Sequence, residues 1–146
     1  MEAIRGNIWE CNNDVIVIPT NGFIKKNGSA VMGRGLALQA SKKYPKLSED
    51  LGVLLKEDGD KVYYLPQGEQ MLVTFPVKYN WWENADLALI RQSASQLSNM
   101  FTESYGSKVC LPKVGCGNGK LNWEDVEPIL DVYLNRKPFL IVDIDK

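Results

Sequence analysis

Residues 14–35 read DVIVIPTNGFIKKNGSAVMGRG, and this stretch decides the fold class. Residues 14–19 are almost continuously apolar and β-branched, which is typical of a strand buried on both faces of a sheet. Residues 20–35 contain four glycines and no apolar period, so they predict a long loop of the kind that carries function. Residues 36–44 are good helix formers and end before Pro45. Strand, loop and helix in this order are the first unit of an α/β fold.

The rest of the chain continues the alternation of strands and helices. Further strands are expected at 3–8, 61–65, 71–77, 108–114 and 139–144, and further helices at about 45–56, 84–101 and from residue 122 onward. Asn84 and Asn122 are the expected N-caps of the last two helices. The first of these two helices has a predicted buried stripe made of Leu87, Ile90, Ala94, Leu97 and Phe101. This order predicts one α/β domain over residues 1–146, with helix layers on both faces of a largely parallel or mixed sheet.

The composition excludes several classes of protein. The chain has no histidine, which removes Ser-His and Cys-His nucleophile pairs and the H-E-x-x-H zinc site. Its three cysteines, Cys11, Cys110 and Cys116, include no C-x-x-C pair, so we expect them to be reduced. No apolar run approaches the roughly 20 residues of a membrane span, and the N-terminus lacks a signal-peptide profile. We therefore expect a cytoplasmic protein with no membrane partner.

Charge is unevenly distributed along the chain. The formal net charge is −1, which is not the footprint of a protein that holds nucleic acid by bulk electrostatics. Residues 15–48, however, carry six cations and no acid. This bias fits either a local anion site or a solvated lysine face.

Two glycine-rich loops are candidates for binding phosphate. Residues 28–35 (GSAVMGRG) lack the Lys-Ser/Thr pair of a P-loop, and the chain has no G-x-G-x-x-G fingerprint. Glycines directly ahead of a helix let backbone N–H groups approach a phosphate, although one such loop alone favours a simple tight turn. Residues 115–119 (GCGNG) form a second loop between a predicted strand and a predicted helix. Two amide-rich loops that face each other at one sheet edge favour a diphosphate-containing ligand.

Residues 75–82 (FPVKYNWW) contain the third candidate loop. Lys78 leaves a buried strand at its carboxyl end. An ordinary lysine is only about one part in 2,500 neutral at pH 7, but burial lowers the pKa of a lysine and favours the nucleophilic amine. Lys78 is thus a surface cation, a phosphate contact or a nucleophile toward C1 of a ribose. Trp81 and Trp82 are core or lid residues, or one of them stacks on a nucleobase.

Several motifs together resemble the macrodomain family. They are Asn21, residues 28–39 (GSAVMGRGLALQ), residues 44–45 (YP), residues 75–78 (FPVK) and residues 111–123 (LPKVGCGNGKLNW). Within the family they are most similar to the branch of DarG-type DNA ADP-ribosyl glycohydrolases and the terminal ADP-ribose protein glycohydrolase. The resemblance implies a three-layer α/β/α fold, in which a mixed, mostly parallel six-stranded sheet binds ADP-ribose at its crest. It implies no metal and no cofactor.

The resemblance also assigns roles to individual residues. Lys78 is the implied catalytic residue, acting on C1 of the distal ribose, and Asn21 is the catalytic-site residue beside that ribose. The implied ligand-binding residues are Asn7, Ile8, Thr20, Asn21, Val31, Met32, Gly33, Arg34, Gly35, Pro112, Val114, Gly115, Cys116, Gly117, Asn118 and Gly119.

Three positions depart from the family pattern. Asn7 stands where the family has the Asp that accepts a hydrogen bond from the adenine amino group, and an amide accepts that bond without supplying charge. Gly119 stands where the protein-directed terminal glycohydrolase has an assisting Asp, which argues against that substrate class. Asn80 replaces the histidine that precedes the tryptophan in the DarG group.

The function expected from this resemblance is hydrolysis that removes ADP-ribose from modified nucleic acid. The expected partners are ADP-ribose and ADP-ribosylated substrates, including single-stranded DNA, bound by a monomer that serves as an antitoxin or a phage counter-defence. Two alternatives stay open, namely a non-catalytic ADP-ribose-binding module and a phosphatase of ADP-ribose 1″-phosphate.

Overall fold

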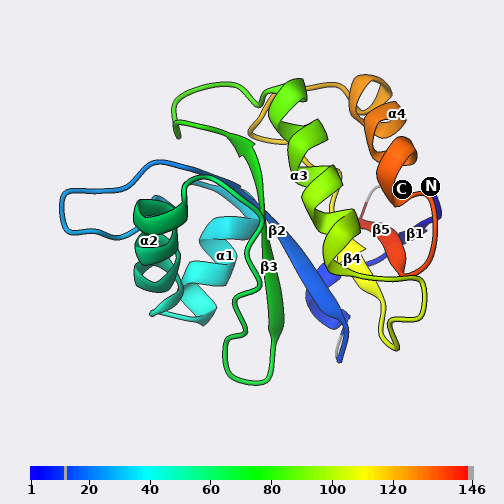
Figure 1. Cartoon of the computed structure of the whole chain (residues 1–146), viewed down its shortest axis with the longest axis horizontal. Helices are drawn as coiled ribbons and strands as arrows, with labels where there is room; N and C mark the ends of the chain where they lie inside the picture. The colour runs from blue at the N-terminus through cyan, green and yellow to red at the C-terminus, as the bar shows by residue number, and fades with distance from the viewer. Residues whose placement is uncertain (12, 145–146) are drawn as a thin grey trace.

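The fold is a parallel sheet between two layers of helices. The computed structural model describes residues 1–11 and 13–144. Within them, five parallel strands form one sheet in the order β1-β5-β4-β2-β3. The strands are β1 (Ala3–Arg5), β2 (Val15–Asn21), β3 (Met71–Lys78), β4 (Val109–Leu111) and β5 (Phe139–Asp143). The helices are α1 (Gly35–Lys43), α2 (Leu47–Asp58), α3 (Leu87–Met100) and α4 (Trp123–Leu134), with a 3-10 helix at Ile8–Glu10. Figure 1 shows α1 and α2 on one face of the sheet and α3 and α4 on the other.

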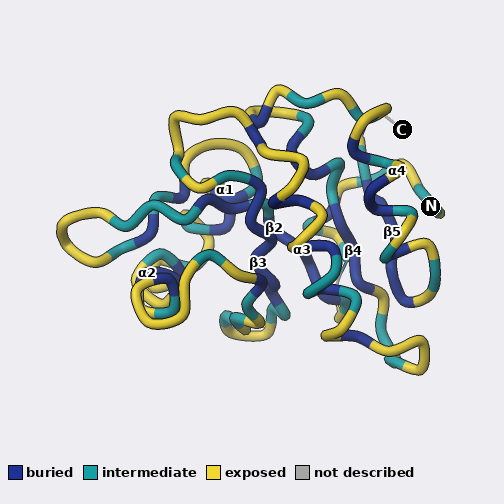
Figure 2. The backbone as a smooth tube through the Cα atoms, turned by 45° about the horizontal axis from the view of Figure 1, so that its top comes forward, coloured by how far each residue is buried: buried dark blue, intermediate teal, exposed yellow. Residues whose placement is uncertain are grey.

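Alternate residues of each strand enter two separate hydrophobic cores. Val15 and Val17 of β2 pack with the apolar side chains of α3 and α4, whereas Ile16 and Ile18 pack with those of α1 and α2. All four are essentially inaccessible to solvent, and the strands run dark blue through the middle of Figure 2. Because both faces of the sheet are covered, the strand has no polar alternation, and the three-layer α/β/α prediction is confirmed.

The predicted sixth strand and the mixed character of the sheet are wrong for the described residues. Residues 61–65 run alongside β3 but form only an isolated antiparallel bridge, between Tyr64 and Val73. The backbone N–H groups of Val62 and Tyr63 donate to side-chain oxygens instead of to a strand. Pro66 then has no N–H to offer. Because these backbone N–H groups do not donate to β3, no continuous ladder of hydrogen bonds forms, and the sheet has five parallel strands.

Two strands are shorter than the sequence predicts. The N-terminal strand ends at Arg5 because Asn7 caps the 3-10 helix, its side-chain oxygen accepting a 3.0 Å hydrogen bond from the N–H of Trp9. The strand predicted at 108–114 ends at Leu111 because Pro112 follows and cannot donate to a ladder.

The predicted N-cap of α3 is also wrong. Asp86 caps this helix instead of Asn84, and its Oδ1 accepts from the N–H groups of Ala88 and Leu89. The buried stripe of α3 is confirmed except at Leu87, whose side chain is exposed because it lies in the first turn. Asn122 does occupy the N-cap position of α4, although its side chain makes no capping hydrogen bond.

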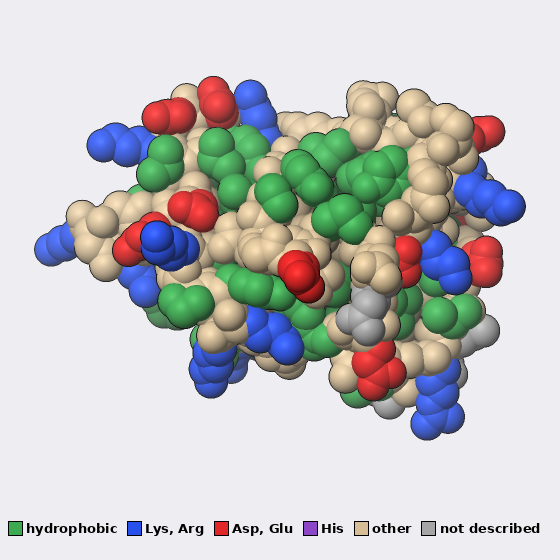
Figure 3. Space-filling model, turned by 90° about the horizontal axis from the view of Figure 1, so that it is seen from below, with side chains coloured by type: hydrophobic (Ala, Val, Ile, Leu, Met, Phe, Trp, Pro, Cys, Tyr) green, Lys and Arg blue, Asp and Glu red, His purple; other side chains and the backbone are tan. Residues whose placement is uncertain are grey.

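The parallel sheet places all strand carboxyl ends at one edge, which we call the crest. The loops that follow β1, β2, β3 and β4 all leave from the crest. The opposite edge, seen from below in Figure 3, carries a broad group of apolar side chains. There Tyr64, Met100, Phe101 and Tyr105 line an open hollow of about 380 Å³. Among the described residues, no helix is both long enough and apolar enough to cross a membrane.

Candidate functional site

The three predicted loops contact one another at the crest. The backbone N–H of Gly22, after β2, donates to the carbonyl of Tyr79, after β3, at 3.0 Å. The N–H of Ala85 donates to the carbonyl of Gly119, in the loop after β4, at 2.9 Å. The expectation that these loops share one edge of the sheet is therefore confirmed.

Lys78 stands where the charged groups of these loops converge. It is the last residue of β3, is half-buried, and pairs in register with Asn21 of β2. Burial lowers the pKa of Lys78 from its ordinary value of 10.5. The Arg34 guanidinium lowers this pKa further, Glu83 raises it and the Lys120 ammonium lowers it. Lys78 is thus within electrostatic reach of two further cations, Arg34 in the loop after β2 and Lys120 in the loop after β4.

Asn21 organises the loop that follows β2. Its side chain is buried, with its Nδ2 donating to the carbonyl of Val31 at 3.0 Å and its Oδ1 accepting from the N–H of Phe23 at 2.9 Å. Each end of an amide has one further hydrogen-bonding position. The side chain can therefore hold the loop and still face a ligand.

The two glycine-rich loops approach each other closely. A Cβ on Gly35 would lie only 3.1 Å from Nδ2 of Asn118, and the φ of Gly35 is +62°. Arg34 is the N-cap of α1 and makes no side-chain capping bond, and the first N–H groups of this helix have no side-chain partner in the part of the chain that the structure describes. The predicted arrangement of two facing amide-rich loops is present, and it suits a diphosphate.

Comparison with known proteins agrees with this arrangement. No family model matches the chain. A DNA ADP-ribosyl glycohydrolase of Mycobacterium tuberculosis is 32% identical over 124 residues, which are 80% of this chain and 35% of the relative. The solved macrodomain of Mycobacterium tuberculosis DarG is 26% identical, with 97% of this chain and 96% of that chain covered and a TM-score of 0.81. The chain has the fold of a macrodomain and is similar to that of DarG.

A more distant relative has been solved with a ligand bound. Thermosipho africanus DarTG, solved in complex with ADP-ribose, is 19% identical and has a TM-score of 0.80, with 99% of this chain and 42% of that chain covered. At this identity the likeness shows the macrodomain fold alone. The chain spans about a third of the length of the curated glycohydrolases that it matches.

Gly119 of the macrodomain has no room for a side chain. A Cβ at this position would lie 2.5 Å from the carbonyl oxygen of Gly115 and 2.7 Å from Cβ of Ala85. Gly115 is equally confined, because its φ is +76° and a Cβ would lie 2.8 Å from Cδ1 of Ile90. The absence of an Asp at 119 therefore follows from the packing of this loop.

The remaining predicted ligand-binding residues differ in how far they are exposed to solvent. Asn7 is exposed at the carboxyl end of β1, so it can meet a ligand although its Oδ1 already accepts one hydrogen bond. The buried members are Ile8, Thr20, Met32, Val114, Gly115 and Gly119, the half-buried ones are Val31, Pro112 and Cys116, and the exposed ones are Gly33, Arg34, Gly35, Gly117 and Asn118. The buried members can contribute backbone and shape, whereas the exposed ones can present atoms to a ligand.

Trp81 and Trp82 are not core residues. Their side chains are 51% and 59% exposed. The two rings meet edge to face with centroids 5.5 Å apart, and Trp82 meets Phe23 in the same way at 5.4 Å. Of the interpretations given to these tryptophans, burial in the core is thus excluded.

Sequence reasoning missed Asp60, because residues 57–60 (EDGD) indicate a solvated turn. Both carboxylate oxygens of Asp60 are buried and have no hydrogen-bond partner among the described residues. They lie against Gly22, where an added Cβ would be 2.7 Å from Oδ2. Burial raises the pKa of Asp60 to about 7. No local signal in the sequence predicts this contact.

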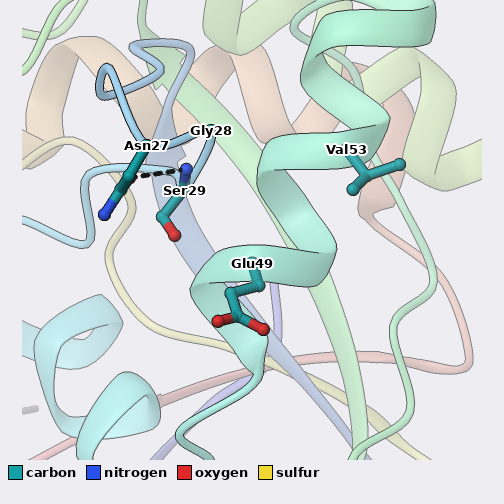
Figure 4. Close-up of a pocket in the computed structure, with 5 residues that line it drawn as sticks. All are labelled: Asn27, Gly28, Ser29, Glu49 and Val53. Atoms are coloured by element: carbon teal, nitrogen blue, oxygen red, sulfur yellow. Dashed lines mark hydrogen bonds between the residues drawn. The ribbon is translucent and has the colours of Figure 1, made fainter.

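A second hollow lies between the loop after β2 and α2, and its lining includes none of the residues to which the resemblance assigns a role. Asn27, Gly28, Ser29, Glu49 and Val53 line it, over a volume of about 350 Å³ (Figure 4). Oδ1 of Asn27 accepts from the N–H of Ser29 at 3.0 Å. Among the described residues, no group of three His, Cys, Asp or Glu side chains is placed to hold a metal ion.

Proposed function

We propose that this macrodomain hydrolyses the bond between ADP-ribose and a modified base of DNA. The observation that carries the proposal is the position of Lys78, half-buried at the crest beside Asn21 and close enough to Arg34 and Lys120 for their charges to act on it. The name of the Mycobacterium tuberculosis relative, a DNA ADP-ribosyl glycohydrolase, supports the same reaction.

The two glycine-rich loops would hold the diphosphate of ADP-ribose. Backbone N–H groups of residues 33–35 and 115–119, with the Arg34 guanidinium, supply donors and positive charge to the phosphate oxygens. The distal ribose then extends toward Asn21 and Lys78, which share a register position in the sheet. Asn7 accepts from the adenine amino group at the far end, without the charge of a carboxylate.

Lys78 would carry the chemical step as a neutral amine. Its Nζ lone pair attacks C1 of the distal ribose, the glycosidic bond breaks, and the base leaves with the electron pair of that bond and takes a proton from the Nζ that is now bonded to C1. Water then displaces Nζ at C1, giving one proton to the lysine amine and its hydroxyl to the released ADP-ribose. At an ordinary pKa the neutral amine is scarce, so the lowered pKa of Lys78 increases the reactive fraction.

The finer features of the proposal concern the setting of the reaction. We propose that the substrate is single-stranded DNA and that residues 1–146 act as one domain and as a monomer in the cytoplasm. In that setting removal of ADP-ribose from DNA would make the protein an antitoxin or a phage counter-defence.

Calorimetry with ADP-ribose, followed by hydrolysis assays, tests the proposed function. The protein should bind ADP-ribose and release it from ADP-ribosylated single-stranded DNA, but not from an ADP-ribosylated protein. Release from the protein conjugate alone would contradict the assignment to DNA.

Two other outcomes distinguish the alternatives. Binding of ADP-ribose without its release from either conjugate would indicate a non-catalytic ADP-ribose-binding module, in which the three cations serve only as phosphate contacts. Release of inorganic phosphate from ADP-ribose 1″-phosphate would instead favour a phosphatase.

A further inference from the structure

Three aromatic rings form a continuous platform on the loops after β2 and β3, with Trp81 and Trp82 exposed and Phe23 half-buried. Phe23 comes from the loop after β2, and Trp81 and Trp82 come from the loop after β3. The two edge-to-face contacts join the rings in the order Phe23, Trp82, Trp81. An edge-to-face contact places the edge of one ring on one face of the other, and about half of the surface of Trp81 and of Trp82 stays exposed to a flat partner.

The platform is held in place by the backbone of both loops. The hydrogen bond from Gly22 to the Tyr79 carbonyl joins them at their roots. In the loop after β3, Oε1 of Glu83 accepts from the N–H of Asn80 at 2.8 Å, and the N–H of Glu83 donates to the Asn80 carbonyl at 3.2 Å. Trp81 and Trp82 lie within this closed turn, so hydrogen bonds hold the backbone that carries them.

The charge around the platform favours one kind of partner. Lys78 ends β3, directly before the loop that carries the two tryptophans, and the charges of Arg34 and Lys120 reach it, so this part of the crest attracts an anionic backbone. Aromatic rings interleaved with cations are the surface on which proteins hold single-stranded nucleic acid, since bases stack on the rings while the phosphates meet the cations.

We propose that Phe23, Trp81 and Trp82 form a stacking subsite for an unmodified base next to the ADP-ribosylated nucleotide. The protein then grips a strand of DNA and not only the ADP-ribose group. The inference rests on the proposed function, because the modified nucleotide must lie at Lys78 for its neighbour to reach the rings. Stacking is tolerant of sequence, so the subsite requires a neighbouring base without specifying which one.

Hydrolysis of two substrates tests this subsite. One is an ADP-ribosylated single-stranded oligonucleotide, and the other is the same modified nucleotide without neighbours. For the wild type, kcat/KM should be higher on the oligonucleotide. Trp81→Ala or Trp82→Ala should lower kcat/KM on the oligonucleotide by roughly 5- to 150-fold per lost stacking contact, and leave the lone nucleotide unchanged. Tyr64→Ala, at an exposed aromatic on the bridge beside β3, is the matched control and should change neither.

Trp81→Phe and Trp82→Phe should recover part of the kcat/KM on the oligonucleotide that the alanine variants lose, because Phe retains a stacking face. An equal loss on both substrates, or no loss on either, would overturn the subsite.

Binding of an unmodified oligonucleotide separates this inference from the proposed function. The oligonucleotide should quench tryptophan fluorescence of the wild type, and less so in the two variants, whether or not the protein hydrolyses anything. Binding of the oligonucleotide without hydrolysis would contradict the proposed hydrolase activity and support the stacking subsite. Hydrolysis without binding of the oligonucleotide would contradict the stacking subsite and support the hydrolase activity.

Discussion

Lys78 lies among charged residues with opposite effects on its pKa. Arg34 and Lys120 lower it, and Glu83 raises it. If the neutral amine is the reactive form, kcat should rise with pH until Lys78 is deprotonated. Glu83→Gln removes a negative neighbour, so it should lower the pKa of Lys78 and shift this rise to lower pH. Lys120→Gln removes a positive neighbour and should shift it to higher pH. A pH profile of kcat for the three proteins checks both shifts, and superimposable profiles would contradict a reactive Lys78 amine.

Asp60 makes stability depend on pH in a defined direction. Its pKa rises from 3.8 in the unfolded chain to about 7 in the folded one. Between these two values the folded state holds a proton that the unfolded state has lost, so the free energy of unfolding falls as pH rises through this range. Above the folded value the loss is complete. It is on the order of 2 kcal/mol, because the carboxylate oxygens are buried but the residue as a whole is only half-buried, so that nearby solvent screens part of the charge.

Urea unfolding of Asp60→Asn against the wild type measures this effect. The difference in stability between about pH 5 and about pH 8 should be larger in the wild type, because the amide does not titrate. Equal pH dependence in both proteins would show that Asp60 is solvated.

At the scale of the elements, the loop after β4 depends on glycine at a position where relatives of another specificity carry Asp. Gly119→Asp places a Cβ against the Gly115 carbonyl and the Ala85 side chain. The free energy of unfolding should fall by about 1–3 kcal/mol. Hydrolysis of ADP-ribose from protein should not appear, because the loop must move to admit the carboxylate. Gly106→Asp, in open space, is the matched control for stability. A stable Gly119→Asp protein that acts on modified protein would contradict this account.

The elements that local patterns encode were predictable from the sequence. Residues 14–19 predicted a strand buried on both faces because each position from 15 to 18 enters one of two cores. Residues 61–65 carry a similar apolar pattern, yet side-chain oxygens of distant residues take the N–H groups that a ladder requires. The site was predictable in part for the same reason. Its loops are marked by glycines in the sequence, but the burial of Asp60 against Gly22 brings together residues that are far apart in the sequence.

At the scale of the whole molecule, the parallel sheet turns a weakly charged chain into a locally cationic site. Arg34, Lys78 and Lys120 are far apart in a sequence of net charge −1. They gather because parallel strands all end at the crest, so each following loop begins there. The N-terminus lies away from the crest, at the amino end of β1, where the Met1 amino group pairs with Asp131 at 2.8 Å.

The rate of ADP-ribose release from ADP-ribosylated single-stranded DNA by Lys78→Ala tests the central claim most directly. Its affinity for ADP-ribose is measured beside it by calorimetry. Lys56→Ala, at an exposed lysine of α2, is the matched control. Lys78→Ala should lose turnover by roughly 10²- to 10⁴-fold while binding ADP-ribose almost as tightly as the wild type. Turnover that survives in Lys78→Ala at the wild-type rate would contradict the claim that this amine performs the reaction.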